Sequence, residues 1–313
     1  MSESFFAALR VVVPMMLLMT LGWYSRTSGM ITRPAMKEFD KIIFKIFMPT
    51  LLFKNIYEMD FSQGFAIKEM VFAFVCLSLI FVFSIYFPRC LTKDGKKSSA
   101  MGQAIVRCNY ILFGVAVSEA LYGEGNVGAV IMLGVLVVPA INVFSAIILE
   151  IGRSGNAKIS RLLLAVLKNP MIIGTILAFI FKFFALSIPA PVWSVVRSVA
   201  NSTTTVSFIS LGIGLDMAEG ISERRLLAWG IFLRMLIVPI IFMPISILMG
   251  FRDQGLCAMM IVFASPTAVA SYPMAVAMGA DGQLAGQLVC VTTILSVLTI
   301  FLWTMLLKTL GLM

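Results

Sequence analysis

Residues 257–279 read CAMMIVFASPTAVASYPMAVAMG, an apolar stretch long enough to span a lipid bilayer. Ser265, Pro266 and Thr267 lie near its middle, and Pro273 follows. Because proline lacks a backbone donor and clashes with the preceding turn, we predict an interrupted helix. Lipid cannot satisfy free backbone groups, so an interrupted span must face protein or a watery cavity, where transporters bind substrates. The alternative is a proline kink packed against neighbouring helices.

Apolar stretches recur along the whole chain. The 313 residues are 60% hydrophobic and 12% charged, with a mean hydropathy of +1.01. We therefore expect an all-α integral membrane protein with ten transmembrane helices, the first of them (Phe5–Trp23) retained because it lacks a basic leader and a cleavage site. The predicted spans are 6–25, 40–57, 66–88, 98–121, 127–150, 161–185, 190–213, 226–249, 253–277 and 283–307.

Several functional classes are disfavoured by composition. The chain has no histidine, which excludes Ser-His-Asp and Cys-His nucleophiles, HExxH zinc sites and the usual haem ligand. Its five cysteines are scattered and form no CxxC. The net charge of +9 comes mostly from short loops rather than from one polar face, so nucleic-acid binding is not expected. We predict neither an enzyme nor a bound metal or cofactor.

The two halves of the chain show an internal repeat. When the sequence is displaced by 156 residues, unusual residues coincide without a gap. The coincident pairs are Pro14 with Pro170, Asp60 with Asp216, Pro88 with Pro244, and Gly123 with Gly279. We predict two five-helix repeats, residues 1–152 and 153–313. Because five spans are an odd number, the second repeat enters the membrane inverted.

Basic residues give an orientation. The loops after spans 1, 3, 5 and 7 carry thirteen lysines and arginines, whereas the other face has five. Cytoplasmic loops are the richer in basic residues, so we expect a multi-pass protein of the cell (inner or plasma) membrane with both termini outside the cytoplasm.

The fourth span contains the stretch that corresponds to the interrupted ninth. It reads GQAIVRCNYILFGVAVSEALYG over residues 102–123, and the repeat places Tyr110 opposite Pro266. Asn109 and Gly114 give this span a polar, helix-weakening centre. Two interrupted helices crossing at the midplane would direct free N–H groups at one point, which suits an anionic ligand.

These motifs resemble those of the auxin efflux carrier family. The matching residues are Arg107-Cys108-Asn109-Tyr110, Phe113-Gly114, Leu121-Tyr122-Gly123, Lys168-Asn169-Pro170, Ser210-Leu211-Gly212 and Ser265-Pro266-Thr267. The resemblance covers nearly the whole chain and implies a ten-span fold similar to that of bile-acid sodium symporters. It also implies a scaffold of spans 1, 2, 6 and 7, a transport domain of spans 3–5 and 8–10, and organic anions such as malate or malonate as substrates.

Polar residues near the predicted crossing are the candidate substrate site. They are Arg107, Asn109, Tyr110, Gly114, Asn142, Ser265, Pro266 and Thr267. A charge as deep in its span as Arg107 is a functional candidate, here as counter-charge for a carboxylate; a structural partner such as Glu119 is the alternative. The position of Arg197 favours anchoring at the interface, and the role of Arg234 is left open.

The sequence thus predicts a secondary transporter of a small organic anion that works by alternating access. A membrane-embedded sensor or a channel-like protein on the same scaffold is the alternative. The coupling ion, proton or sodium, is left open, as is a homodimer. Proton coupling would want a buried carboxylate, for which Glu119 is the nearest candidate.

Overall fold

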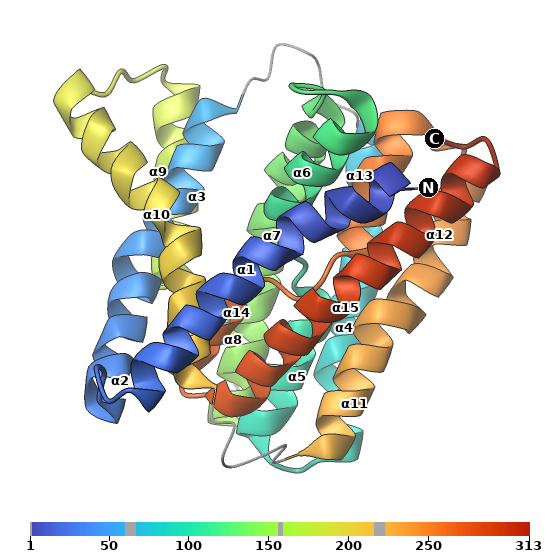
Figure 1. Ribbon diagram of the computed structural model, residues 1–313. Helices are drawn as coiled ribbons and strands as arrows, with labels where there is room; N and C mark the ends of the chain where they lie inside the picture. Colours follow the sequence, from blue (N-terminus) through green and yellow to red (C-terminus); the bar gives the residue numbers. More distant parts are fainter. Residues whose placement is uncertain (1, 60–66, 156–158, 216–222) are drawn as a thin grey trace.

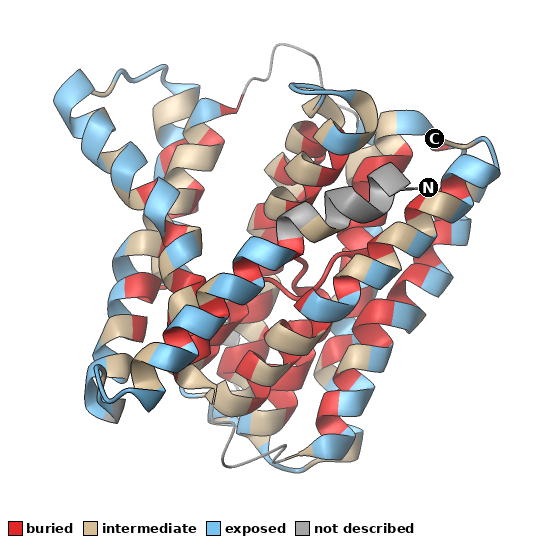
Figure 2. Ribbon diagram, viewed as in Figure 1, coloured by how far each residue is buried: buried red, intermediate tan, exposed pale blue. Residues whose placement is uncertain are grey.

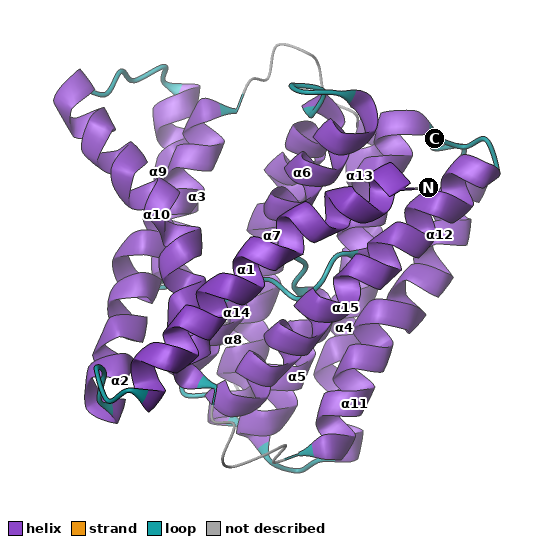
Figure 3. Cartoon of the chain, in the orientation of Figure 1, coloured by secondary structure: helices purple, strands orange, loops and turns teal. Residues whose placement is uncertain are grey.

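The computed structural model describes residues 2–59, 67–155, 159–215 and 223–313, nearly all of them helical (Figure 3). The elements are α1 (Ser2–Thr27), α2 (Arg33–Ile42), the π-helical η1 (Ile43–Phe47), α3 (Met48–Glu58), α4 (Ile67–Leu91), α5 (Gly95–Val106), α6 (Tyr110–Tyr122), α7 (Gly128–Ser154), α8 (Ile159–Leu167), α9 (Pro170–Phe183), α10 (Ala190–Gly214), α11 (Arg224–Phe232), the π-helical η2 (Leu233–Ile237), α12 (Val238–Leu248), α13 (Asp253–Ala264), α14 (Ser271–Ala277) and α15 (Gly282–Thr309).

Long apolar helices confirm a helical membrane protein. Within the described ranges, four are long and apolar enough to cross a bilayer: Ile67–Leu91, Gly128–Ser154, Arg224–Leu248 and Gly282–Thr309. Shorter apolar helices lie at Tyr110–Tyr122, Pro170–Phe183 and Asp253–Ala264. The aspartates that contributed one coincident pair to the predicted repeat, Asp60 and Asp216, lie outside the described residues.

Two predicted span boundaries need correction. The second helix begins at Arg33 rather than at 40, because the Thr32 hydroxyl accepts a hydrogen bond from Ala35 N (3.5 Å) and caps it. The predicted span 161–185 is not continuous. Pro170 begins a new helix there, which Asn169 caps through a hydrogen bond from Met171 N to its Oδ1 (3.0 Å).

The helices pack in two groups (Figure 1). The helices α1, α3, α9 and α10 pack on one another, and the helices α4, α5, α7, α12 and α13 form a second group. Helix α1 also contacts α6 and α15, which joins the groups. Both ends of the chain lie at the same end of the bundle (Figure 1).

Glycines allow α1 and α10 to approach backbone to backbone. A Cβ atom on Gly22 would lie 2.0 Å from the Ile209 carbonyl oxygen, and one on Gly212 would lie 2.0 Å from the Met19 carbonyl oxygen. Small residues at helix interfaces in membranes permit this close contact. The Gly212 of the Ser210-Leu211-Gly212 motif therefore has a packing role.

The two π-helical segments precede prolines. Segment η1 ends two residues before Pro49, and η2 ends two residues before Pro239. Proline cannot donate to the helix and clashes with the carbonyl four residues earlier, and a wider π turn accommodates both effects. Segment η2 carries Arg234, which is fully buried.

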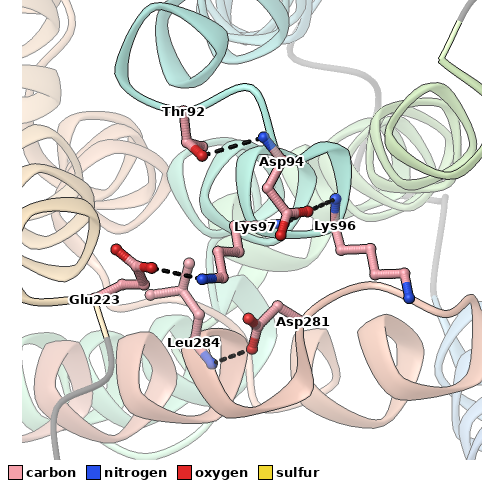
Figure 4. A network of polar contacts seen from close by, with 7 residues as sticks. All are labelled: Thr92, Asp94, Lys96, Lys97, Glu223, Asp281 and Leu284. Carbon is pink, nitrogen blue, oxygen red and sulfur yellow. Dashed lines mark hydrogen bonds and ion pairs between the residues drawn. The ribbon is translucent and has the colours of Figure 1, made fainter.

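At the end of the bundle opposite the termini, capping residues tie three helices together (Figure 4). Asp94 caps α5 by accepting from Lys96 N (2.8 Å), and Asp281 caps α15 by accepting from Leu284 N (2.9 Å). Lys97 forms an ion pair with Glu223 next to the start of α11. Asp281 N also donates to Lys96 O (3.3 Å), so these contacts fix the ends of α5, α11 and α15 relative to one another.

Burial is greatest in helices α5 and α13. Every residue from 98 to 106 of α5 and from 256 to 264 of α13 is buried, whereas the outer faces of α1, α4 and α10 are exposed (Figure 2). Protein therefore surrounds the two helices that end in mid-bundle, as the lack of backbone partners in lipid requires.

Candidate functional site

The centre of the bundle contains two helix breaks that pair with each other. Helix α5 ends at Val106 and α6 begins at Tyr110; helix α13 ends at Ala264 and α14 begins at Ser271 (Figure 3). The segments 107–109 and 265–270 run antiparallel. Asn109 N donates to Pro266 O (2.9 Å), and Ala268 N donates to Arg107 O (3.0 Å). Both predicted interruptions are thus present, and each satisfies part of the other's backbone.

Pro266 acts as its chemistry predicts. It offers no N–H to the Val262 carbonyl, which instead accepts a hydrogen bond from Arg234 Nη2 (2.9 Å). The fourth span breaks without a proline. There Arg107 and Asn109 leave the helical conformation, and their carbonyl and amide groups bond across to 265–270.

A cavity of about 100 Å³, here called the central cavity, lies beside these breaks. Its polar wall comes from the first break and from α7: Arg107, Cys108, Asn109, Tyr110 and Asn142. Its other walls are mainly apolar: Met48, Leu51, Leu52, Asn55, Ile56, Met59, Ile111, Val138, Ile141, Met171, Ala268 and Ala270. The cavity therefore lies between α3 and α9 on one side and α6, α7 and the breaks on the other.

Arg107 carries a charge that no described carboxylate neutralises. The side chain is buried, with Nη2 donating to Asn142 Oδ1 (2.7 Å). Its other contacts are the thioethers of Met274 (Nη1–Sδ 2.6 Å) and Met171 (Nη2–Sδ 3.7 Å), which are weak acceptors. Glu119, the alternative partner considered from the sequence, instead accepts from Gly125 N (3.4 Å).

Three donors on residues of the polar wall lack partners. Within the described part of the chain, Arg107 Nε, Asn109 Nδ2 and the Tyr110 hydroxyl make no hydrogen bond, although all three atoms are buried. A buried donor without a partner costs free energy. All three donors belong to residues that line the central cavity.

The structure separates the eight predicted site residues into two sets. Arg107, Asn109, Tyr110 and Asn142 line the central cavity together. The remaining four lie outside its wall: Gly114, Ser265, Pro266 and Thr267.

These four residues have other contacts. A Cβ atom on Gly114 would lie 2.5 Å from Val130 Cγ1, so Gly114 allows α6 to pack on α7. Thr267, a candidate substrate-site residue from the sequence, does not offer a free N–H, because this group donates to Thr292 Oγ1 (3.2 Å). The Thr267 hydroxyl donates to Ala104 O (2.9 Å). Ser265 and Pro266 contribute carbonyl oxygens to Arg234 and Asn109.

Two buried charged residues were not assigned from the sequence. The Arg234 guanidinium bonds to backbone carbonyls at both breaks. Asp40 is buried at the start of the second predicted span and accepts from the Ser210 and Tyr272 hydroxyls (Tyr272 3.2 Å). Depth in an apolar span was the available signal for Arg234, whereas Asp40 lies at a predicted span boundary, and the partners of both are distant in sequence.

Arg197 lies at the exposed surface of helix α10. It forms an ion pair with Glu58 (Nη2–Oε1 2.9 Å), and its guanidinium lies 5.3 Å from the centre of the Trp193 ring. The side chain is exposed. These contacts agree with anchoring at the interface.

A second, larger cavity of about 410 Å³ lies toward the end of the bundle opposite the termini and is here called the end cavity. Its walls are Phe44, Glu150, Arg153, Leu164, Ala165, Lys168, Asn169, Pro170, Ala277 and Met278. Arg153 donates to Glu150 (Nε–Oε2 3.0 Å). Asn169 of the end cavity and Met171 of the central cavity both lie at the start of α9.

Comparison with known proteins gives the family. The family model described as "Membrane transport protein" matches residues 7–304. The chain belongs to the membrane transport protein family. The match confirms the resemblance to the auxin efflux carrier family that the motifs indicated, since this is one and the same family.

Two relatives are similar to this chain over most of their lengths. An "Uncharacterized transporter" of Methanothermobacter thermautotrophicus is 21% identical over 313 residues, covering 97% of this chain and 99% of the relative. The "Uncharacterized transporter YfdV" of Escherichia coli K12 is 24% identical over 272 residues, covering 82% of this chain and 84% of the relative. Transport across a membrane is therefore the function class of this chain.

Proposed function

We propose that the protein is a secondary transporter of a small organic anion, and that it binds the anion in the central cavity. One observation carries the proposal: the buried Arg107 guanidinium faces an amide and two thioethers, but no described carboxylate. A charge in such a position is costly unless a partner of opposite sign is present for part of the cycle. A substrate carboxylate supplies that partner.

The neutral donors favour a carboxylate in particular. A carboxylate has two oxygens that accept several hydrogen bonds, and the residues of the cavity wall carry three buried donors without partners among the described residues: Arg107 Nε, Asn109 Nδ2 and the Tyr110 hydroxyl. The cavity volume of about 100 Å³ corresponds to several water molecules, which suits an acid of a few carbon atoms.

The arrangement of the helices supports alternating access. We propose ten spans in two inverted repeats, with α1, α3, α9 and α10 belonging to the scaffold and the paired breaks to the moving part. The central cavity lies between these two groups, so a relative movement would expose it to one side and then to the other. We further propose that the end cavity, which carries Arg153 and Lys168, is the route to the cytoplasmic side.

The driving force proposed is the membrane potential. Moving one charge through 100 mV yields about 2.3 kcal/mol, so an anion can be expelled without a coupled ion. Glu119, the sequence candidate for proton coupling, is only partly buried and bonds to a loop amide away from the cavity.

A two-stage experiment tests the function. Purified protein is first screened by thermal shift against mono- and dicarboxylic acids of two to six carbons at constant ionic strength, and at least one should raise the melting temperature. The stabilising acid is then used in counterflow with proteoliposomes. Stabilisation without counterflow would indicate a sensor, rapid uptake without counterflow would indicate a channel, and stabilisation by none of the acids would reject the anion site.

A further inference from the structure

The ends of two interrupted helices expose carbonyl oxygens at one point. Helices α5 and α13 both end in mid-bundle, at Val106 and Ala264. The last carbonyls of a helix have no partner within it, and the helix dipole adds partial negative charge there. In interrupted transporter helices, such carbonyl ends are where a coupling cation such as sodium binds.

In this protein a side chain holds that position. The Arg234 guanidinium donates from Nε to Ser265 O (3.0 Å) and from Nη2 to both Ser265 O (2.7 Å) and Val262 O (2.9 Å). From Nη1 it donates to Ile105 O (3.3 Å), so a single cation binds the ends of both helices. The side chain is fully buried.

Arg234 differs from Arg107 in the nature of its partners. The four hydrogen bonds from Arg234 to oxygen atoms all go to backbone carbonyls, and its side-chain partner is the Cys108 thiol at the first break. Arg107 instead donates to Asn142 and Met171 in the wall of the central cavity. Arg234 thus compensates the helix ends, while the charge of Arg107 remains available for a ligand.

We propose that Arg234 is a built-in substitute for a coupling cation, which holds the two helix ends together and makes the transporter independent of sodium. This inference rests on the proposed function only for its consequence in transport. The permanent charge of arginine keeps the site occupied throughout the cycle, because the guanidinium is tethered to η2 and does not dissociate. The anion then moves alone and carries net charge across the membrane.

The cation dependence of melting tests the assignment without any substrate. Melting temperatures of the wild type, Arg234→Ala and Arg234→Lys are compared in the chloride salts of sodium, lithium, potassium and N-methyl-D-glucamine at equal ionic strength. The wild type and Arg234→Lys should melt at the same temperature in all four salts. Arg234→Ala should melt lower in N-methyl-D-glucamine and gain at least about 3 °C in a small cation, with a saturable dependence on concentration.

Arg107→Gln is the matched control, since it also removes a buried arginine but leaves the helix-end carbonyls bound. Its melting temperature should not depend on the cation. Sodium-specific stabilisation of the wild type would overturn the proposal. An Arg234→Ala variant that melts at the same temperature in all four salts would also overturn the proposal, and so would one that fails to fold in every salt. In either case the vacated carbonyl site would not bind a small cation, although the proposal requires that such a cation restores stability.

Counterflow of the stabilising acid then tests the consequence for transport. Wild-type counterflow should keep its rate within twofold when N-methyl-D-glucamine replaces sodium on both sides. A tenfold loss would overturn sodium independence while leaving the anion transporter intact. Absence of counterflow in every salt would reject the proposed function instead, and the melting experiment would still decide the role of Arg234.

Discussion

Replacing Arg107 with glutamine should separate binding from folding. The amide of glutamine keeps a donor near Asn142 but removes the charge from the central cavity. Removing one partner of a buried, hydrogen-bonded charge pair typically costs about 2–5 kcal/mol of binding free energy, which corresponds to a dissociation constant raised about 30-fold to 5,000-fold. We expect the stabilising carboxylic acid to lose affinity within this range.

The stability of the ligand-free Arg107→Gln variant should increase or stay the same, although its affinity for the acid falls. The wild-type guanidinium is bound by one amide oxygen and two thioethers, so its removal leaves no buried carboxylate uncompensated. The melting temperature of ligand-free Arg107→Gln should therefore hold or rise. Isothermal titration gives the dissociation constant, and a thermal melt without ligand gives the stability.

An exposed arginine provides the control. Arg197→Gln removes a charge from the exposed surface of helix α10, where its ion pair with Glu58 is screened by solvent, and should change neither affinity nor melting temperature appreciably. An unchanged dissociation constant in Arg107→Gln would refute the anion site. A large loss of folded protein in that variant would show that the guanidinium is structural.

Three other predictions concern orientation, packing and the breaks. A variant whose single cysteine is the exposed Cys90 should react with impermeant maleimide in inside-out vesicles and hardly at all in intact cells, and the reverse pattern would overturn the predicted topology. Gly212→Ala should lower the free energy of unfolding by about 1–3 kcal/mol, because the added Cβ would meet a backbone carbonyl of α1. The control Gly255→Ala, whose Cβ would have no neighbour nearer than 3.8 Å, should leave the melting temperature almost unchanged. Equal effects of the two substitutions would contradict the close packing of α1 on α10. Pro266→Ala and Asn109→Ala should each raise the dissociation constant of the acid without changing the melting temperature. The effects of the two substitutions on binding should be non-additive in a double-mutant cycle. Wild-type affinity in both single variants would reject a role of the two helix breaks in binding the acid.

The breaks could be predicted because their signals are local. Pro266 in an apolar stretch cannot continue a helix, and the repeat directed attention to Asn109 in the fourth span. Four of the predicted residues around these breaks do line one cavity. The double repeat itself remains a prediction.

The contacts of Thr267 and Arg234 could not be predicted, because they depend on which helices meet. Thr267 looks like a free polar residue in the sequence, but its donors are taken by Ala104 and Thr292. Arg234 has no unusual neighbours in sequence, and only the π turn and the two helix ends reveal its role. Asp40 was missed because it lies at a predicted span boundary, where a charge is ordinary.

The pairing of the breaks also affects how the protein is made. Helix α5 has 12 residues, about 18 Å at 1.5 Å per residue, which is too short for a hydrocarbon core of about 30 Å. Its end is completed by Arg234, 129 residues after Ile105, and by Thr267, 163 residues after Ala104. While these later segments are still on the ribosome, the nascent chain holds an arginine and free carbonyls at membrane depth without their final partners. We therefore expect insertion of the first half to need a protected, water-accessible site in the insertion machinery, and chains truncated before residue 234 to be substrates for quality-control proteolysis.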